Sequence, residues 1–262
     1  ADHPDLHSFP TRRSSDLGTI LGNGFFNPGN YWCEGYGTPR FLGQIHISYA
    51  DGSEEVIGSG PDWKAHGSPI LLDNVYDGEH YDARRDIPGW ASPGYDDNGW
   101  EPVGLRKAPG GKLQAQTAPP DKIMERLPPV KTEKLGNGHY RVDFGEEISG
   151  WVRINRVEGE PGRRIDIRYL CESAVGDNSY TLRGGGPEEY AARFTWFVFR
   201  EVEIINWPGE LLPEDLTAEA VYSDVERAGN FSSSDILFNK IHQIWRRSQT
   251  DNMHGGVASD CP

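Results

Sequence analysis

Residues 197–204 read FVFREVEI, an alternation of apolar and polar side chains that predicts a half-buried β-strand. Similar alternation recurs in residues 141–144 (RVDF), 151–154 (WVRI) and 164–169 (RIDIRY). Successive side chains of a strand point to opposite faces, so each of these strands has one buried and one solvated face. That arrangement favours an antiparallel sandwich over a parallel sheet, and we predict a mainly β fold.

A second strand-rich region precedes this one. Residues 40–49 (RFLGQIHISY) place apolar side chains on alternate positions, and an Asp51-Gly52 turn separates them from residues 55–57 (EVI), which predicts a β-hairpin. Two proline pairs, at 119–120 and 128–129, bracket a segment that we interpret as a stiff linker. The chain is therefore expected to hold two antiparallel β-sandwich, jelly-roll-like domains.

The last part of the chain changes character. A helix predicted to begin near Ser234 carries one apolar stripe, formed by Leu237, Ile241, Ile244 and Trp245. The helix is expected to stop before the glycines at 255–256. A lone helix with an apolar face is marginal in water, so the stripe predicts a covering domain of which this helix is the first element.

Residues 5–17 (DLHSFPTRRSSDL) back-translate codon for codon onto a short-read sequencing adapter. We interpret residues 1–17 as an assembly artefact and leave them out of the fold prediction, as one would an expression tag. The natural start of the chain is then not represented.

Composition restricts the classes of partner. The formal net charge of −14 argues against a nucleic-acid partner, because such affinity depends on clustered lysine and arginine. No run of eighteen apolar residues is present, so no membrane-spanning segment is expected. The cysteines at 33, 171 and 261 show no metal-site or paired spacing, and no cofactor or metal is predicted.

Residues 76–84 (YDGEHYDAR) concentrate titratable groups, and two interpretations stay open. On a strand, Asp77, Glu79 and Tyr81 would share a side, and carboxylates flanking a sugar can act as acid and base. Alternatively, Glu79 or Asp82 pairs with a following arginine and pins a loop, while the other charges are solvated. Charge-paired structural loops outnumber active sites, so the second interpretation is favoured.

Other polar groups carry weaker signals. Asp96 and Asp97 lie on a glycine-rich stretch without the ligand spacing of a calcium loop, so they indicate a turn. His242, on the flank of the predicted helix, indicates a surface or capping contact. Residues 249–256, just past the helix, suit either the rim of a pocket or an ordinary loop.

Five blocks, taken in order, resemble bacterial α-L-rhamnosidases. They are YDGEHYDAR with DDNGW, QAQTAPP with ERLPPV, VDFGEEISGWVRI, FTWFVFREVEI, and GNFSSSDILFNKI with SQTDNMHGGVASDCP. The resemblance covers residues 18–262. It implies an incomplete carbohydrate-binding-like sandwich over 18–116, a second sandwich over 117–224, and the start of an (α/α)6 catalytic barrel over 225–262.

The resemblance also implies a site. In this family a DCP sequence opens a longer motif, DCPxRxER, whose aspartate contacts rhamnose and whose final glutamate is the general acid. Asp260 matches that aspartate, so it is the predicted substrate-binding residue. No catalytic residue is expected within the chain, because the acid and the base would follow Pro262. The parent reaction would be inverting hydrolysis of a rhamnose-containing oligosaccharide or glycoside.

A second hypothesis is a non-catalytic carbohydrate-binding β-sandwich protein. Its exposed aromatic side chains, such as Trp63 or Trp90, would stack on sugar rings. Binding of rhamnosylated oligosaccharides without hydrolysis would favour this alternative.

Overall fold

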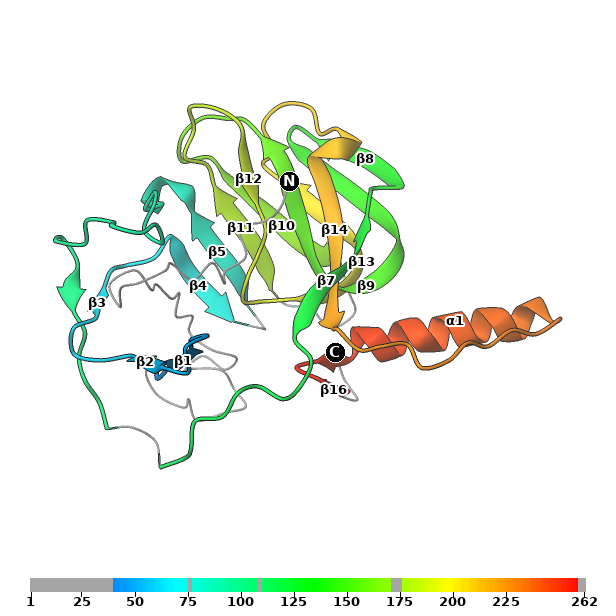
Figure 1. Ribbon diagram of the computed structural model, residues 1–262. Helices are drawn as coiled ribbons and strands as arrows, with labels where there is room; N and C mark the ends of the chain where they lie inside the picture. The colour runs from blue at the N-terminus through cyan, green and yellow to red at the C-terminus, as the bar shows by residue number, and fades with distance from the viewer. Residues whose placement is uncertain (1–39, 75–76, 108–109, 171–175, 259–262) are drawn as a thin grey trace.

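The structure is a computed structural model, which describes residues 40–74, 77–107, 110–170 and 176–258. It is mainly β, as predicted, with one α-helix among the described residues (Figure 1). The strands are β1 (Gln44–Ser48), β2 (Glu54–Gly58), β3 (Lys64–Ala65), β4 (Ile70–Asn74), β5 (Gly78–Asp82), β6 (Glu101–Pro102), β7 (Asp121–Leu127), β8 (Lys131–Gly136), β9 (His139–Val157), β10 (Arg164–Leu170), β11 (Asp177–Thr181), β12 (Glu188–Tyr190), β13 (Phe197–Ile205), β14 (Leu216–Ser223), β15 (Met253–His254) and β16 (Val257–Ala258). The helix is α1 (Ile236–Asp251), and short 3-10 turns lie at Ala83–Arg85 and Pro213–Asp215.

A ten-stranded sheet forms the body of the molecule, in the order β4-β5-β11-β10-β13-β9-β14-β7, with β8 and β12 also paired to β9. The long strand β9 links the other strands of this sheet, because four of them pair with it. Its first residues pair with β8 and β13, and its last residues pair with β14 and β12. The strands predicted at 141–144 and 151–154 are confirmed, but they are two parts of one strand, because the chain bends between them without leaving the sheet.

The bend is a bulge with a local cause. Asp143 pairs with Glu201 and Ile148 with Phe199, so residues 144–147 lie opposite Arg200 alone. Gly145 takes a positive φ of 83° at this point, which side chains with a Cβ rarely adopt. Extra residues on one strand bend it and increase its twist, so the sheet curls around its core.

The curled sheet encloses one core of apolar side chains. Phe199 is 0% exposed and lies edge-on to Tyr169, with ring centroids 4.8 Å apart. Phe144 packs against Phe199 from β9, at 6.1 Å. The alternation in residues 197–204 therefore predicted the buried face, although the bulge shifts its phase by one residue between Phe199 and Val202.

The predicted linker between the two proline pairs is a strand. Residues 121–127 form β7, which pairs antiparallel with β14 at the end of the sheet order. The linker prediction was therefore wrong. Prolines lack an N–H donor, so the pairs at 119–120 and 128–129 end an edge strand rather than mark free chain.

The N-terminal region contributes to the same sheet. The hairpin β1–β2 forms as predicted, with Gln44 opposite Gly58. The hairpin β4–β5 instead lies beside β11 (Figure 1), and β5 pairs parallel to it, an exception to the antiparallel pattern. The close approach requires glycine at position 78, where a Cβ would lie 2.0 Å from the Asp177 carbonyl oxygen. The ten-stranded sheet thus draws on residues from both sides of the predicted boundary at 116.

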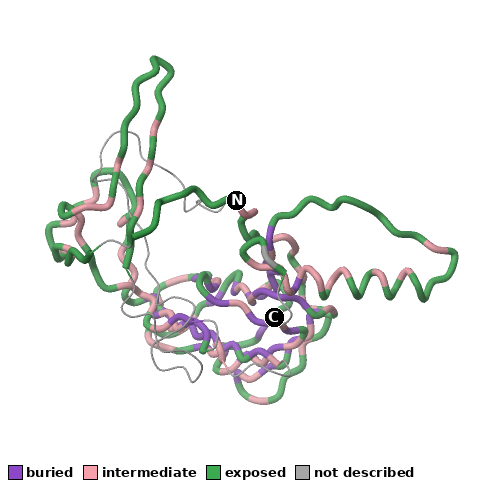
Figure 2. The backbone as a smooth tube through the Cα atoms, turned by 90° about the horizontal axis from the view of Figure 1, so that it is seen from below, coloured by how far each residue is buried: buried purple, intermediate pink, exposed green. Residues whose placement is uncertain are grey.

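Helix α1 begins after its N-cap, Asp235, whose carboxylate accepts from the Leu237 amide at 2.8 Å. The predicted apolar stripe is exposed on this helix, with Ile244 at 66% and Leu237 at 61%. Figure 2 shows the contrast, with buried residues gathered in the sheet and mainly exposed or intermediate ones along the helix. No described helix combines the length and the apolar character that a membrane span needs.

Candidate functional site

The C-terminal end of α1 is fastened to the sheet by an arginine. Arg247 donates from both terminal nitrogens to Glu125 on β7, at 3.0 and 2.9 Å, and from Nε to Glu146 on β9, at 2.9 Å. Glu125 also accepts from the Tyr222 hydroxyl at 2.9 Å, so its oxygens are held in place. These charge-assisted bonds lower the pKa of Glu125, and they fix the last turns of the helix against two strands.

Five side chains surround the end of α1 and the turn that follows it, and we call them the C-terminal anchor: Asp121, Ser149, Trp196, Asp251 and His254. Asp251 is 4% exposed and accepts from the Ser149 amide at 3.1 Å. Burial raises the pKa of Asp251 to about 7, against the opposing effects of the Ser149 N–H and the Arg247 charge. Asp251 therefore changes its protonation state near neutral pH.

His254 is the centre of the anchor. Its ring stacks on the Trp196 indole, with centroids 4.4 Å apart and planes 19° apart. Its Nε2 lies 2.8 Å from the Ser149 hydroxyl, and its Nδ1 lies 3.6 Å from Asp121. Burial lowers the pKa of His254, so the imidazole is neutral at neutral pH.

The turn after His254 is held by its backbone. The Gly255 amide donates to Asp121 at 2.9 Å, and the Gly256 amide donates to the Ser223 hydroxyl at 2.7 Å. This turn joins β15 to β16, and Asp260 follows β16 by two residues in the sequence. Asp260 lies outside the described residues. The structure describes the residues that lead up to Asp260 in the sequence, from Asp251 to the β15–β16 hairpin.

Of the two hypotheses for residues 249–256, a pocket rim or an ordinary loop, the structure favours neither in its simple form. The segment is a packed anchor that ties the helix end to β7, β9 and β14. Ser149 and Trp196 were missed by the sequence analysis. They lie more than fifty residues before His254, and no local pattern connects them to it.

The contacts of the charged motif at 76–84 agree in part with each of the two interpretations. Asp82 accepts from Arg84 at 2.8 Å through both Nε and a terminal nitrogen, so the predicted loop-pinning pair is confirmed. Glu79 and Tyr81 share a face, as both contact Tyr190. Glu79, however, is fully buried rather than solvated or paired with Arg84, and burial raises its pKa.

The remaining polar candidates have structural contacts. Asp97 accepts from Lys64 at 2.7 Å, and Asp96 accepts from the Asn98 amide at 3.1 Å, which is the turn expected there. His242 packs against Phe231, with ring centroids 5.0 Å apart. No group of three or more His, Cys, Asp or Glu side chains in the described ranges is placed to hold a metal ion.

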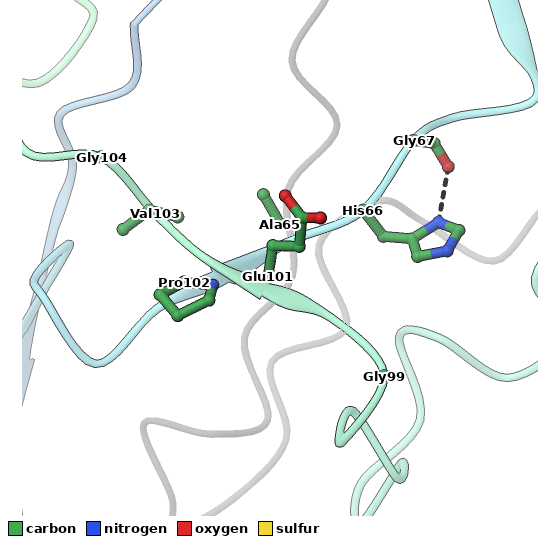
Figure 3. Close-up of a pocket in the computed structure, with 8 residues that line it drawn as sticks. All are labelled: Ala65, His66, Gly67, Gly99, Glu101, Pro102, Val103 and Gly104. Carbon is green, nitrogen blue, oxygen red and sulfur yellow. Dashed lines mark hydrogen bonds between the residues drawn. The ribbon is translucent and has the colours of Figure 1, made fainter.

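The tryptophans named for sugar stacking are half-buried. Trp63 stacks on Phe41, with centroids 5.5 Å apart. Strands β3 and β6 border a pocket of about 610 Å³ (Figure 3). Glu101 and His66 are its charged or titratable lining side chains, and the His66 ring lies 5.5 Å from that of Trp100.

Two family models match the chain in consecutive order. The model of the alpha-L-rhamnosidase N-terminal domain matches residues 6–125, and that of the bacterial alpha-L-rhamnosidase concanavalin-like domain matches residues 133–222. The chain belongs to the bacterial α-L-rhamnosidase family. The resemblance drawn from the sequence blocks is confirmed. The first match begins within residues 1–17, so the adapter assignment, like the domain boundaries at 116 and 224, stays a prediction.

Solved α-L-rhamnosidases share this fold. The enzyme from Dictyoglumus thermophilum aligns with a TM-score of 0.80 and 37% identity over 87% of this chain and 27% of its own. That from Streptomyces avermitilis, solved with L-rhamnose, aligns with a TM-score of 0.79 and 33% identity over 87% of this chain and 23% of its own.

A curated α-L-rhamnosidase of Formosa agariphila is 32% identical over 94% of this chain and 28% of its own length. The chain therefore spans about a quarter of the rhamnosidases that it matches.

Proposed function

We propose that this chain is the front part of a glycoside hydrolase that removes terminal α-L-rhamnose from glycans or glycosides, and that it is inactive by itself. The observation that carries the proposal is the consecutive match of two rhamnosidase domain models on a chain that spans about a quarter of its relatives. The catalytic acid and base are assigned to sequence beyond these residues.

Asp260 is the proposed substrate-binding residue. In inverting hydrolysis an acid protonates the departing oxygen while a carboxylate about 6.5–9.5 Å away activates water on the opposite face of the sugar. Positive charge develops at the anomeric carbon in the transition state, and an anionic carboxylate near that carbon stabilises it. The C-terminal anchor supports this role, because it fastens the chain at Gly255 through Asp121, and the Ser223 hydroxyl fastens it at Gly256, four residues before Asp260.

Hydrolysis of p-nitrophenyl α-L-rhamnoside tests the proposal. We expect no turnover by this chain and turnover by a longer chain that continues the same reading frame. In the longer chain, Asp260→Asn is expected to raise KM, because a contact to the sugar is weakened, and to lower kcat, because the negative charge that stabilises the transition state is lost. Turnover by the 262-residue chain alone would contradict the placement of both catalytic carboxylates.

The pocket bordered by β3 and β6 favours a second candidate, non-catalytic carbohydrate binding. The His66 ring and the Glu101 carboxylate line this pocket, and a flat ring beside a hydrogen-bonding group suits a sugar, whose faces are apolar and whose edges are polar. Calorimetric titration with rhamnosylated oligosaccharides tests it. Heat of binding that is lost in His66→Ala and in Glu101→Ala would support this candidate, and absence of heat would reject it.

A further inference from the structure

Glu79 lies on β5 and is 0% exposed, yet the hydrogen-bond partners of its carboxylate are remote in sequence. Its Oε1 accepts from the Tyr190 hydroxyl at 3.1 Å. Its Oε2 accepts from the backbone amides of Arg193 and Phe194, at 3.0 and 3.3 Å. A carboxylate only accepts hydrogen bonds, so three converging donors match it.

The two amides belong to the segment 191–196, which connects β12 to β13. Two residues after Phe194 the same segment presents Trp196, whose indole stacks on His254 at 4.4 Å. His254 in turn contacts the Ser149 hydroxyl at 2.8 Å. A continuous set of contacts therefore runs from the charged motif near residue 79 to the hairpin β15–β16.

We propose that Glu79 is a positioning residue: it fixes the backbone of segment 191–196 so that Trp196 holds His254 and, with it, the β15–β16 hairpin. The coupling concerns contacts within this chain. Its relevance to rhamnose binding rests on the proposed function, in which Asp260 lies six residues after His254.

The chain contains a matched control for this arrangement. Glu188 is 6% exposed and also accepts from one tyrosine hydroxyl and two backbone amides: Tyr180 at 3.0 Å, Arg183 at 2.9 Å and Gly184 at 2.8 Å. Its acceptor oxygens fix residues 183–184, which precede β12. Glu188 therefore has the same acceptor chemistry as Glu79 without a hydrogen bond to segment 191–196.

Hydrogen–deuterium exchange of the 262-residue chain tests the coupling. Glu79→Leu removes the acceptor and leaves two amides without a partner, so we expect exchange to accelerate about tenfold in 191–197 and in 252–258. Glu188→Leu is expected to accelerate exchange around 183–187 and to leave 252–258 at the wild-type rate. Glu79→Gln keeps one oxygen for both amides and is expected to retain most of the protection.

A second readout follows His254 itself. In Glu79→Leu the loosened stack admits water, so the imidazole pKa, measured by NMR, is expected to rise toward its ordinary value, while it stays lowered in Glu188→Leu. If Glu79→Leu exchanges fast in 191–197 but keeps the wild-type exchange rate in 252–258, the proposal is overturned.

If Glu79→Leu fails to fold, Tyr190→Phe can be used instead, because it removes one hydrogen-bond donor to Glu79 and keeps the ring. Exchange is then measured in 191–197 and 252–258, and a smaller acceleration is expected. Neither readout involves hydrolysis, so failure of the coupling and failure of the proposed function are separate results.

Discussion

The ten-stranded sheet buries its apolar side chains, whereas helix α1 leaves those of its apolar stripe exposed. In the sheet, Phe199 and Val142 are 0% exposed, whereas on the helix Ile244 is 66% and Trp245 59% exposed. The sheet buries its apolar face against itself because it curls. The helix is held by polar contacts at its C-terminal end instead, and this contrast teaches that the two regions depend on different interactions for their stability.

The largest effect is expected in the sheet. Phe199→Ala removes a fully buried ring that contacts Tyr169 and Phe144, and should lower the free energy of unfolding by about 3–5 kcal/mol. Urea denaturation followed by circular dichroism at a β-sheet wavelength measures this. A loss below about 1 kcal/mol would mean that the sheet core is less tightly packed than its burial indicates.

The second effect depends on pH and concerns Asp251 at the end of the helix. Its pKa is about 7 in the folded chain and 3.8 in the unfolded reference, so the folded state binds the proton more tightly between these values. Stability of the wild type should therefore fall as pH rises through this window, by up to about 1.4 kcal/mol per pH unit.

Asp251→Asn does not titrate and can still accept from the Ser149 amide. Relative to the wild type, the variant should gain stability as pH rises from 5 to 7 and gain no more above that range. Urea titrations of both proteins at matched pH values give the difference, in which the other titrating groups cancel. A difference independent of pH would show that Asp251 is ionised throughout.

A smaller effect is expected for the arginine that fastens the helix. Arg247→Ala removes bonds to Glu125 and Glu146, both partly exposed, so a loss of about 1–2 kcal/mol is expected. Helical signal at 222 nm should melt earlier than the sheet signal. Arg246→Ala is the matched control on the same helix, since no ion pair of Arg246 is found within the described residues.

The smallest effect is expected on the uncovered face of the helix. Ile244→Lys should change the free energy of unfolding by less than about 0.5 kcal/mol, because the side chain is already in water. Urea denaturation of this chain measures it. The same substitution in a longer chain from the same reading frame should cost several-fold more if the face is covered there, and equal effects in both chains would remove the contrast between the two regions.

Much of the fold could be predicted from local patterns. The hairpin at residues 44–58 follows from alternation on both sides of an Asp-Gly turn, and the helix follows from its 3.6-residue period. Strand β7 was missed because the flanking prolines dominate the local signal. The continuity of β9 across residues 144–151 was not predicted, because the sequence at a bulge resembles the end of a strand.

The candidate site was less predictable. Asp260 could be named from its motif, but the side chains that hold the approach to it come from β9, from the β12–β13 connection and from β7. Such contacts join residues more than fifty positions apart, so no periodicity records them. The same holds for Glu79, whose charge in the sequence suggested solvent or an arginine partner.

By itself, the sequence determined the β class, the amphipathic helix and the family, because alternation, helical period and ordered motifs are local properties. Only the tertiary structure decided which strands join one sheet, that Glu79 is buried among three donors, and that His254 stacks on Trp196. These depend on the way the curled sheet brings distant backbone segments together, and burial then gives each polar contact its strength.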